Sequence, residues 1–152
     1  MEMACATQNP QLLHSSLTLQ STLEYSTGNY RSAIAIAREG IEIAQNMGDA
    51  LQYLICEAIC IRSLLHIGEW GEAKLHLANA LQIADKNGNV FAATFFTSAM
   101  GWLHELAFDY EGARCLCAAA MEQVRDDPGS YNAFFVLIRL GLAHLVSCPI
   151  NT

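Results

Sequence analysis

Three copies of one segment, spaced forty residues apart, constrain the fold of this chain more than any other feature. The segments are residues 28–48, 68–88 and 108–128, and each begins at a turn and continues into an alanine-rich amphipathic stretch. A period of this length, repeated three times, is typical of arrays in which one structural unit stacks on the next. The sequence therefore predicts a repeat architecture.

Each period divides into two helices. In the first copy, Ala33, Ala37, Ile41 and Ala44 recur at spacings of three and four, which places them on one face of a helix. The stretches before each copy are nearly uncharged, as expected for helices that are flanked on several sides. We expect helices over residues 11–27, 30–46, 51–67, 70–86, 91–107, 110–125 and 131–146.

These helices predict an all-α solenoid of antiparallel helix pairs. The repeats are expected at residues 11–50, 51–90 and 91–130, with an extra helix at 131–146, in a single array over residues 11–147. Residues 1–10 are expected to be a flexible N-terminus and residues 148–152 a tail.

Small side chains recur at two places in each copy and predict close helix packing. Large aromatic residues at the turn are expected to act as wedges between the paired helices. The small residues are Ala33, Ala73 and Ala113 after the turn and Gly40, Ala80 and Ala120 further along, and the aromatic residues are Tyr30, Trp70 and Tyr110.

Composition narrows the classes of function. With 53% hydrophobic and 15% charged residues, the 152-residue chain has ample material for a core, and its net charge of −7 argues against direct binding of nucleic acid. The N-terminus lacks the pattern of a secretory signal, and the apolar stretch 131–146 is shorter than a membrane span. Four of the six cysteines lie in helical patterns, which favours reduced thiols and a cytoplasmic protein with no membrane partner.

The helix pair resembles the tetratricopeptide repeat. The matching residues are Gly28, Tyr30, Ala33, Gly40 and Ile41, then Gly68, Trp70, Ala73, Ala80 and Leu81, then Tyr110, Ala113, Ala120 and Met121, with Gly101 in a first helix. The period of forty is longer than the usual 34, and Phe108 replaces the turn glycine. The long period is similar to tetratricopeptide-type arrays in bacterial signalling proteins and transcription regulators.

A search for chemistry finds no catalytic motif. Cys56 and Cys60 share a helix face as two metal ligands would, but we interpret them as buried thiols. His104 and His144 lie one period apart, and we interpret them as packing residues rather than a metal or proton site. We therefore expect a non-enzymatic chain without a metal or cofactor.

The resemblance implies a right-handed α-solenoid, a TPR-like superhelix, whose first helices line a concave groove for a peptide or partner domain. Carried over by register from the turn, the partner-binding groove residues are Tyr25, Ile55, Arg62, Leu65, His66, Phe95, Ser98, Trp102 and Glu105. Arg62 and Trp102 occupy equivalent positions and are residue types that dominate binding energy at interfaces. The alternative, weighed equally, is that Trp102 packs between repeats and Arg62 pairs with Glu57 or Glu105.

Two further functions remain open. In one, the array is the effector-sensing segment of a larger signalling ATPase or transcription regulator. In the other, the last helix mediates self-association and forms a homodimer. The residues expected to carry that contact are Phe134, Phe135, Ile138 and Leu142.

Overall fold

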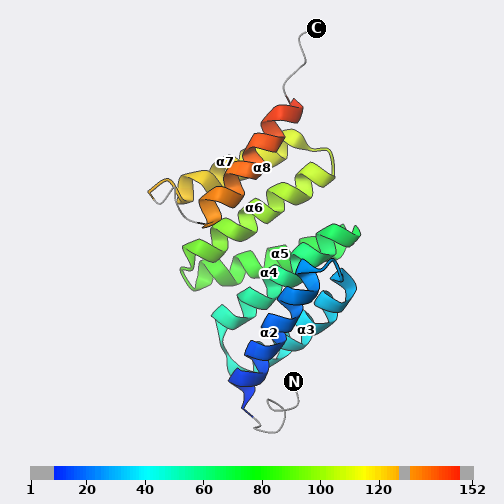
Figure 1. Cartoon of the computed structure of the whole chain (residues 1–152). Helices are drawn as coiled ribbons and strands as arrows, with labels where there is room; N and C mark the ends of the chain where they lie inside the picture. Colours follow the sequence, from blue (N-terminus) through cyan, green and yellow to red (C-terminus); the bar gives the residue numbers. More distant parts are fainter. Residues whose placement is uncertain (1–8, 127–130, 148–152) are drawn as a thin grey trace. The chain divides into compact units, whose positions relative to one another are not determined.

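The computed structural model describes residues 9–126 and 131–147, except for the side chains of residues 131, 132, 134, 135 and 147. These residues form α-helices joined by short turns, and no strand occurs among them (Figure 1). The all-α helical-repeat prediction is confirmed, with helix bounds close to those expected. The helices are α2 (Pro10–Ser26), α3 (Tyr30–Met47), α4 (Ala50–Ile67), α5 (Trp70–Lys86), α6 (Val90–Leu106), α7 (Tyr110–Gln123) and α8 (Tyr131–Ser147).

Left-handed residues end successive helices at intervals of twenty. Gly28, Gly48, Gly68 and Gly88 have φ between 63° and 83°, and Phe108 takes the next place in the series with φ 61°. This conformation satisfies the last carbonyls of a helix and is accessible to glycine without strain. Phe108 adopts it at a cost, since a bulky side chain disfavours positive φ. The sequence period of forty is therefore two helix-plus-turn steps of twenty.

The chain divides into two compact units, Met1–His76 and Leu77–Thr152, and the boundary falls inside α5. In unit 1, α3 packs against both α2 and α4, and α4 also contacts α2. Gly40 allows the close approach of α3 to α4, because a Cβ added there would lie 2.6 Å from Cys56 Sγ. The glycine therefore sets how near the two helices lie.

Unit 2 repeats this arrangement. The helix α7 packs against α6 and α8, and α8 also contacts α6 (Figure 1). Gly101 of α6 faces α7, because a Cβ there would lie 2.7 Å from Cys117 Sγ. Cys117, Ala120 and Val136 form a buried cluster between α7 and α8. In each unit, the first helices of two consecutive repeats therefore lie side by side: α2 and α4 in unit 1, and α6 and α8 in unit 2.

The recurring small residues pack as the sequence predicts. Ala33, Ala73 and Ala113 are completely buried, and so are Ala80 and Ala120. The turn aromatics are only partly covered, and Trp70 is 39% exposed. The small residues therefore form the inner face of the helix pairs and the aromatics form its edge.

Among the described residues, one helix, α4, is long and apolar enough to cross a membrane by length and composition alone. Within the fold, 56% of that segment is buried, and it contains Glu57 and Arg62. A core helix of a helical protein passes the same test.

Candidate functional site

A cluster of aromatic and cationic side chains lies on unit 1, where α2, α3 and α4 meet. We call Tyr25, Tyr30, Arg62 and His66 the Arg62 cluster. The Arg62 guanidinium carbon lies 4.2 Å from the centroid of the Tyr25 ring, a cation–π geometry. Tyr30 stacks on His66 with ring centroids 4.5 Å apart and an angle of 5° between the planes. Three helices thus hold one continuous aromatic surface with a fixed cation.

Hydrogen bonds fix the orientation of this cluster. Arg62 Nε donates to the Tyr25 hydroxyl at 3.1 Å, and the same hydroxyl lies 3.2 Å from His66 Nε2. Because an arginine can only donate, the Tyr25 oxygen accepts that bond and its own proton is available for His66 Nε2. Tyr25 therefore holds both neighbours in place with one hydroxyl group.

Within residues 9–126 and 131–147, Arg62 makes no ion pair with a carboxylate. Its η nitrogens also make no hydrogen bond among those residues, while its guanidinium is only partly buried. The cluster consequently offers an oriented, partly exposed cation beside aromatic rings. This combination suits recognition of a polar group on a partner.

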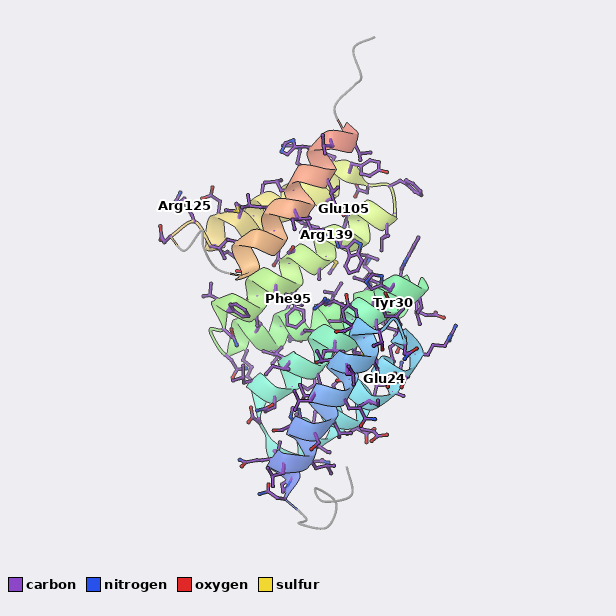
Figure 2. All side chains as sticks on the ribbon, in the orientation of Figure 1. Glu24, Tyr30, Phe95, Glu105, Arg125 and Arg139 are labelled. Atoms are coloured by element: carbon purple, nitrogen blue, oxygen red, sulfur yellow. The ribbon has the colours of Figure 1, made fainter. Side chains whose placement is uncertain are left out.

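A second cation–aromatic pair lies on unit 2, between α6 and α8. The Arg139 guanidinium carbon lies 4.1 Å from the centroid of the Trp102 ring, and Arg139 Nη1 donates to Glu105 Oε2 at 3.1 Å. Figure 2 labels Arg139 and Glu105. The side chains of Arg139 and Glu105 are only 17% and 12% exposed. Burial raises the pKa of the Glu105 carboxyl, and the bond from Arg139 partly opposes that rise. This pair fastens α8 to α6.

On α6, two buried polar atoms near this pair lack a hydrogen-bond partner among the described residues. They are Glu105 Oε1 and Ser98 Oγ, both on α6. Ser98, Trp102 and Glu105 are spaced by four and three, so they share one face of that helix. The face is therefore buried but not fully satisfied in its hydrogen bonding.

A third polar group is buried in unit 1, away from the Arg62 cluster. Glu57 is 2% exposed, and its Oε2 lies 2.7 Å from His76 Nδ1. Glu72 lies 3.6 Å from the other ring nitrogen of His76 and also binds Arg38. The bond to Glu57 is the main cause that raises the pKa of His76. The network ties α3 and α4 to the first part of α5, and its contacts are those of a structural clamp.

The structure places the predicted groove residues in two classes. Tyr25, Arg62, His66 and Ile55 are accessible to different degrees, and Ile55 is 38% exposed. The others are covered by packing: Leu65 (2% exposed), Phe95 (7%), Ser98 (0%), Trp102 (8%) and the Glu105 side chain (12%).

The two interpretations of Arg62 and Trp102 can now be separated. Trp102 is buried and packs under Arg139, as the packing interpretation expects. Arg62 donates to Tyr25 and not to either carboxylate considered for it. Of those carboxylates, Glu57 is bound by His76 and Glu105 is bound by Arg139. The tryptophan thus belongs to the scaffold, whereas the arginine stays partly accessible.

The other residues considered for chemistry have local partners. Cys56 Sγ lies 3.3 Å from His14 Nε2 in the core, and burial raises the pKa of the Cys56 thiol, so this pair lacks a reactive thiolate. His104 Nδ1 lies 2.7 Å from Asp109 Oδ2. In the part of the chain that the structure describes, no three His, Cys, Asp or Glu side chains are grouped as metal ligands would be.

Sequence reasoning missed two members of these clusters. Tyr30 was expected to be only a packing wedge, and it stacks on His66 thirty-six residues away. Arg139 was not proposed for any site, although it is the only Lys, Arg, Asp or Glu residue in an otherwise apolar helix. An isolated charge in an apolar helix is a signal for a buried partner, which here is Glu105.

The antiparallel helices packed in sequence within each unit define a helical-repeat protein. No protein-family model matches the chain, and no curated protein matches it. Seven chains of solved structures do match.

One of these is the crystal structure of the apo form of RapI, with a TM-score of 0.80 and 14% sequence identity. The match covers 94% of this chain and 40% of the RapI chain, so this chain spans less than half of that protein's length. At this identity the likeness concerns the fold alone. It supports the helical-repeat architecture, while the tetratricopeptide assignment stays a resemblance.

Proposed function

We propose that this chain is a non-enzymatic protein-interaction module that binds a peptide or a segment of a partner protein at the Arg62 cluster. The observation that carries the proposal is the stacked, oriented and partly exposed guanidinium of Arg62, which has no carboxylate partner among the described residues. A charged donor kept in place by aromatic rings loses little conformational entropy on binding. Its η nitrogens, which make no hydrogen bond among the residues that the structure describes, are the donors offered to the partner.

The surroundings support a protein ligand. The cluster brings the partly exposed rings of Tyr25 and Tyr30 into contact, and such side chains are large and have few rotatable bonds. Ile55 adds an exposed apolar side chain on the same helix as Arg62, two turns before it. Anchors of this kind, an arginine among tyrosines, dominate the binding energy of many interfaces.

The test is selection from a displayed library of random twelve-residue peptides, followed by affinity measurement on single peptides. We expect peptides selected on the wild type to bind Arg62→Ala at least about tenfold more weakly, the loss of one hot-spot residue. The matched control is Arg125→Ala, which removes the same charge from an exposed position in unit 2. Selection of no peptide, or equal binding to wild type and Arg62→Ala, would refute the proposal.

An effector-sensing role makes a different prediction in the same protein. A small effector raises the melting temperature by mass action, without any peptide or protein present. Screening a metabolite library by thermal shift therefore separates the two functions. Stabilisation by a small molecule that survives Arg62→Ala would favour the sensor.

A further inference from the structure

The forty-residue period makes the first helices of the repeats, α2, α4, α6 and α8, structurally equivalent. Each unit contains one contact between two of them, α4 on α2 in unit 1 and α8 on α6 in unit 2. In such a contact we call the face of the later helix the seating face and the face of the earlier helix the receiving face.

The seating face is defined by three positions that are covered wherever a preceding first helix is present. In α4 they are Cys56, Ile59 and Ser63, which are 0%, 9% and 0% exposed. In α8 the equivalent residues, eighty positions later, are Val136, Arg139 and Ala143. Val136 and Ala143 are fully buried, and the Arg139 side chain is 17% exposed. Cys56 contacts His14 and Thr18 of α2, and Arg139 contacts Trp102 and Glu105 of α6.

The same positions in α2 are occupied by Ser16, Leu19 and Leu23. The two leucines are 72% and 62% exposed, and Leu12, one turn before Ser16, is 52% exposed. Two of the three positions that are covered in α4 and α8 are thus occupied in α2 by leucines in contact with water, and the third is occupied by Ser16. Three exposed leucines along one side of a helix, interrupted only by Ser16, form an apolar strip that suits contact with another protein surface.

The receiving face shows the complementary pattern. In α6 it consists of Ser98, Trp102 and Glu105, which are covered, and the last two hold Arg139 of α8. Forty residues later, α8 carries Ile138, Leu142 and Leu145, which are 45%, 45% and 77% exposed. This face is also apolar.

The two exposed faces match in chemistry. The face on α2 consists of Leu12, Leu19 and Leu23 with Ser16 between them, the face on α8 consists of Ile138, Leu142 and Leu145, and neither set includes a charged side chain. The single cation of α8, Arg139, is engaged with α6 and does not oppose an apolar partner. Neither face therefore carries a charge that would repel or require a counter-ion.

We propose that copies of this chain associate head to tail, with α2 of one copy seated on α8 of another as α8 is seated on α6. The occupant of the α8 face is thus a second copy of the chain. The contact is heterologous, since it joins two different surfaces, and each added copy leaves one free face at either end of the assembly. This inference is independent of the Arg62 cluster.

The size of the contact sets the concentration at which it forms. The exposed parts of these side chains offer on the order of 500 Å² of apolar surface, below the area of a standard stable interface. The association is therefore weak, and it requires high protein concentration to be observed.

The test uses two charge variants of the full chain. Variant A is Leu19→Glu with Leu23→Glu on α2, and variant B is Leu142→Glu with Leu145→Glu on α8. All four positions are at least 45% exposed, so both variants should keep the helical fold, which circular dichroism checks. The control is Leu75→Glu on α5, an equally apolar position that is 68% exposed and belongs to neither face.

Sedimentation from about 1 µM to about 1 mM covers the affinities expected for a contact of this size. We expect the mean mass of the wild type and the control to rise with concentration, whereas A and B alone stay monomeric. An equimolar mixture of A and B should form a dimer and nothing larger, because A retains α8 and B retains α2. This rescue by mixing is specific to a head-to-tail contact.

Three results would overturn the proposal. Dimers of A alone would show that α8 pairs with α8 of another copy, the homodimer expected from the sequence. A mixture of A and B that stays monomeric would exclude contact between α2 and α8. A wild type that is monomeric over the whole range would mean that the two faces serve another polypeptide segment rather than a second copy.

Discussion

The same substitution, glycine to alanine, should have opposite effects at two positions that are one repeat apart. Gly101 and Gly141 occupy equivalent places in α6 and α8. A Cβ at Gly101 would lie 2.7 Å from Cys117 Sγ, whereas a Cβ at Gly141 would meet nothing within 4 Å. Helix propensity favours alanine equally at both places, so the difference isolates the cost of packing α6 against α7.

The expected changes in the free energy of unfolding follow from helix propensity and from the cost of overpacking. Alanine in place of glycine in a helix interior stabilises by about 1 kcal/mol, and overpacking a buried contact costs about 1–3 kcal/mol. We therefore expect Gly141→Ala to raise the free energy of unfolding by about 1 kcal/mol. We expect Gly101→Ala to lower it by about 1 kcal/mol, which in a chain of this size lowers Tm by about 2–4 °C.

Urea unfolding of dilute protein measures both changes, and a double-mutant cycle tests their cause. Cys117→Ala removes the sulfur, after which the nearest atoms to a Cβ at residue 101 are Ala113 O at 3.5 Å and Leu116 Cβ at 3.7 Å. In that background Gly101→Ala should stabilise, which gives a coupling of about 1–3 kcal/mol between the two positions. Equal stabilisation by Gly101→Ala in both backgrounds would refute the argument that Gly101 sets the helix spacing.

The remaining predictions concern pH, thiol reactivity and the strained turn. The bond to Glu57 raises the pKa of His76 in the folded state, so the protonated imidazole stabilises the fold. This contribution to the free energy of unfolding is fully present below the unfolded pKa of about 6.5 and is lost as the pH rises through the folded pKa. The advantage of the wild type over His76→Gln in urea unfolding should therefore shrink from pH 6 toward pH 9, and an advantage that grows would contradict this sign. With the thiols outside the described residues replaced by serine, exposed Cys115 should react with a thiol reagent at least about ten times faster than Cys117, whose pKa burial raises to about 11. Phe108→Gly should stabilise by about 1 kcal/mol by removing a bulky residue at φ 61°, and a lower Tm would show that the contact of this ring with Tyr110 outweighs the strain.

Much of the fold could be predicted from the sequence because its determinants are local and periodic. The spacing of Ala33, Ala37 and Ala44 specifies a helix face without knowledge of any partner, and their burial agrees with it. Phe108 could be assigned to a turn because it stands where the other copies have glycine, and its positive φ confirms the register. Each repeat therefore supports the interpretation of the others.

The candidate site could be predicted only in part. Arg62 was identified because it occupies the groove position equivalent to Trp102 and is a residue type that dominates binding energy at interfaces, but the sequence left open whether it binds a partner or a carboxylate of the same chain. The aromatic rings that orient it, Tyr25 and Tyr30, come from two other helices. Which side chains meet across helices depends on helix rotation and separation, and these quantities are not encoded in any local pattern.

By itself, the sequence determined the repeat, the helix pairs and the small residues at their contacts, since these depend on spacing along one chain. Only the tertiary structure decided which charges are paired. It assigned Glu57 to His76, Glu105 to Arg139 and Arg62 to Tyr25, whereas sequence proximity would have suggested Arg62 and Glu57. The physical reason is that a buried charge must find its partner in three dimensions, and the penalty for leaving it unpaired selects among arrangements that the sequence alone treats as equal.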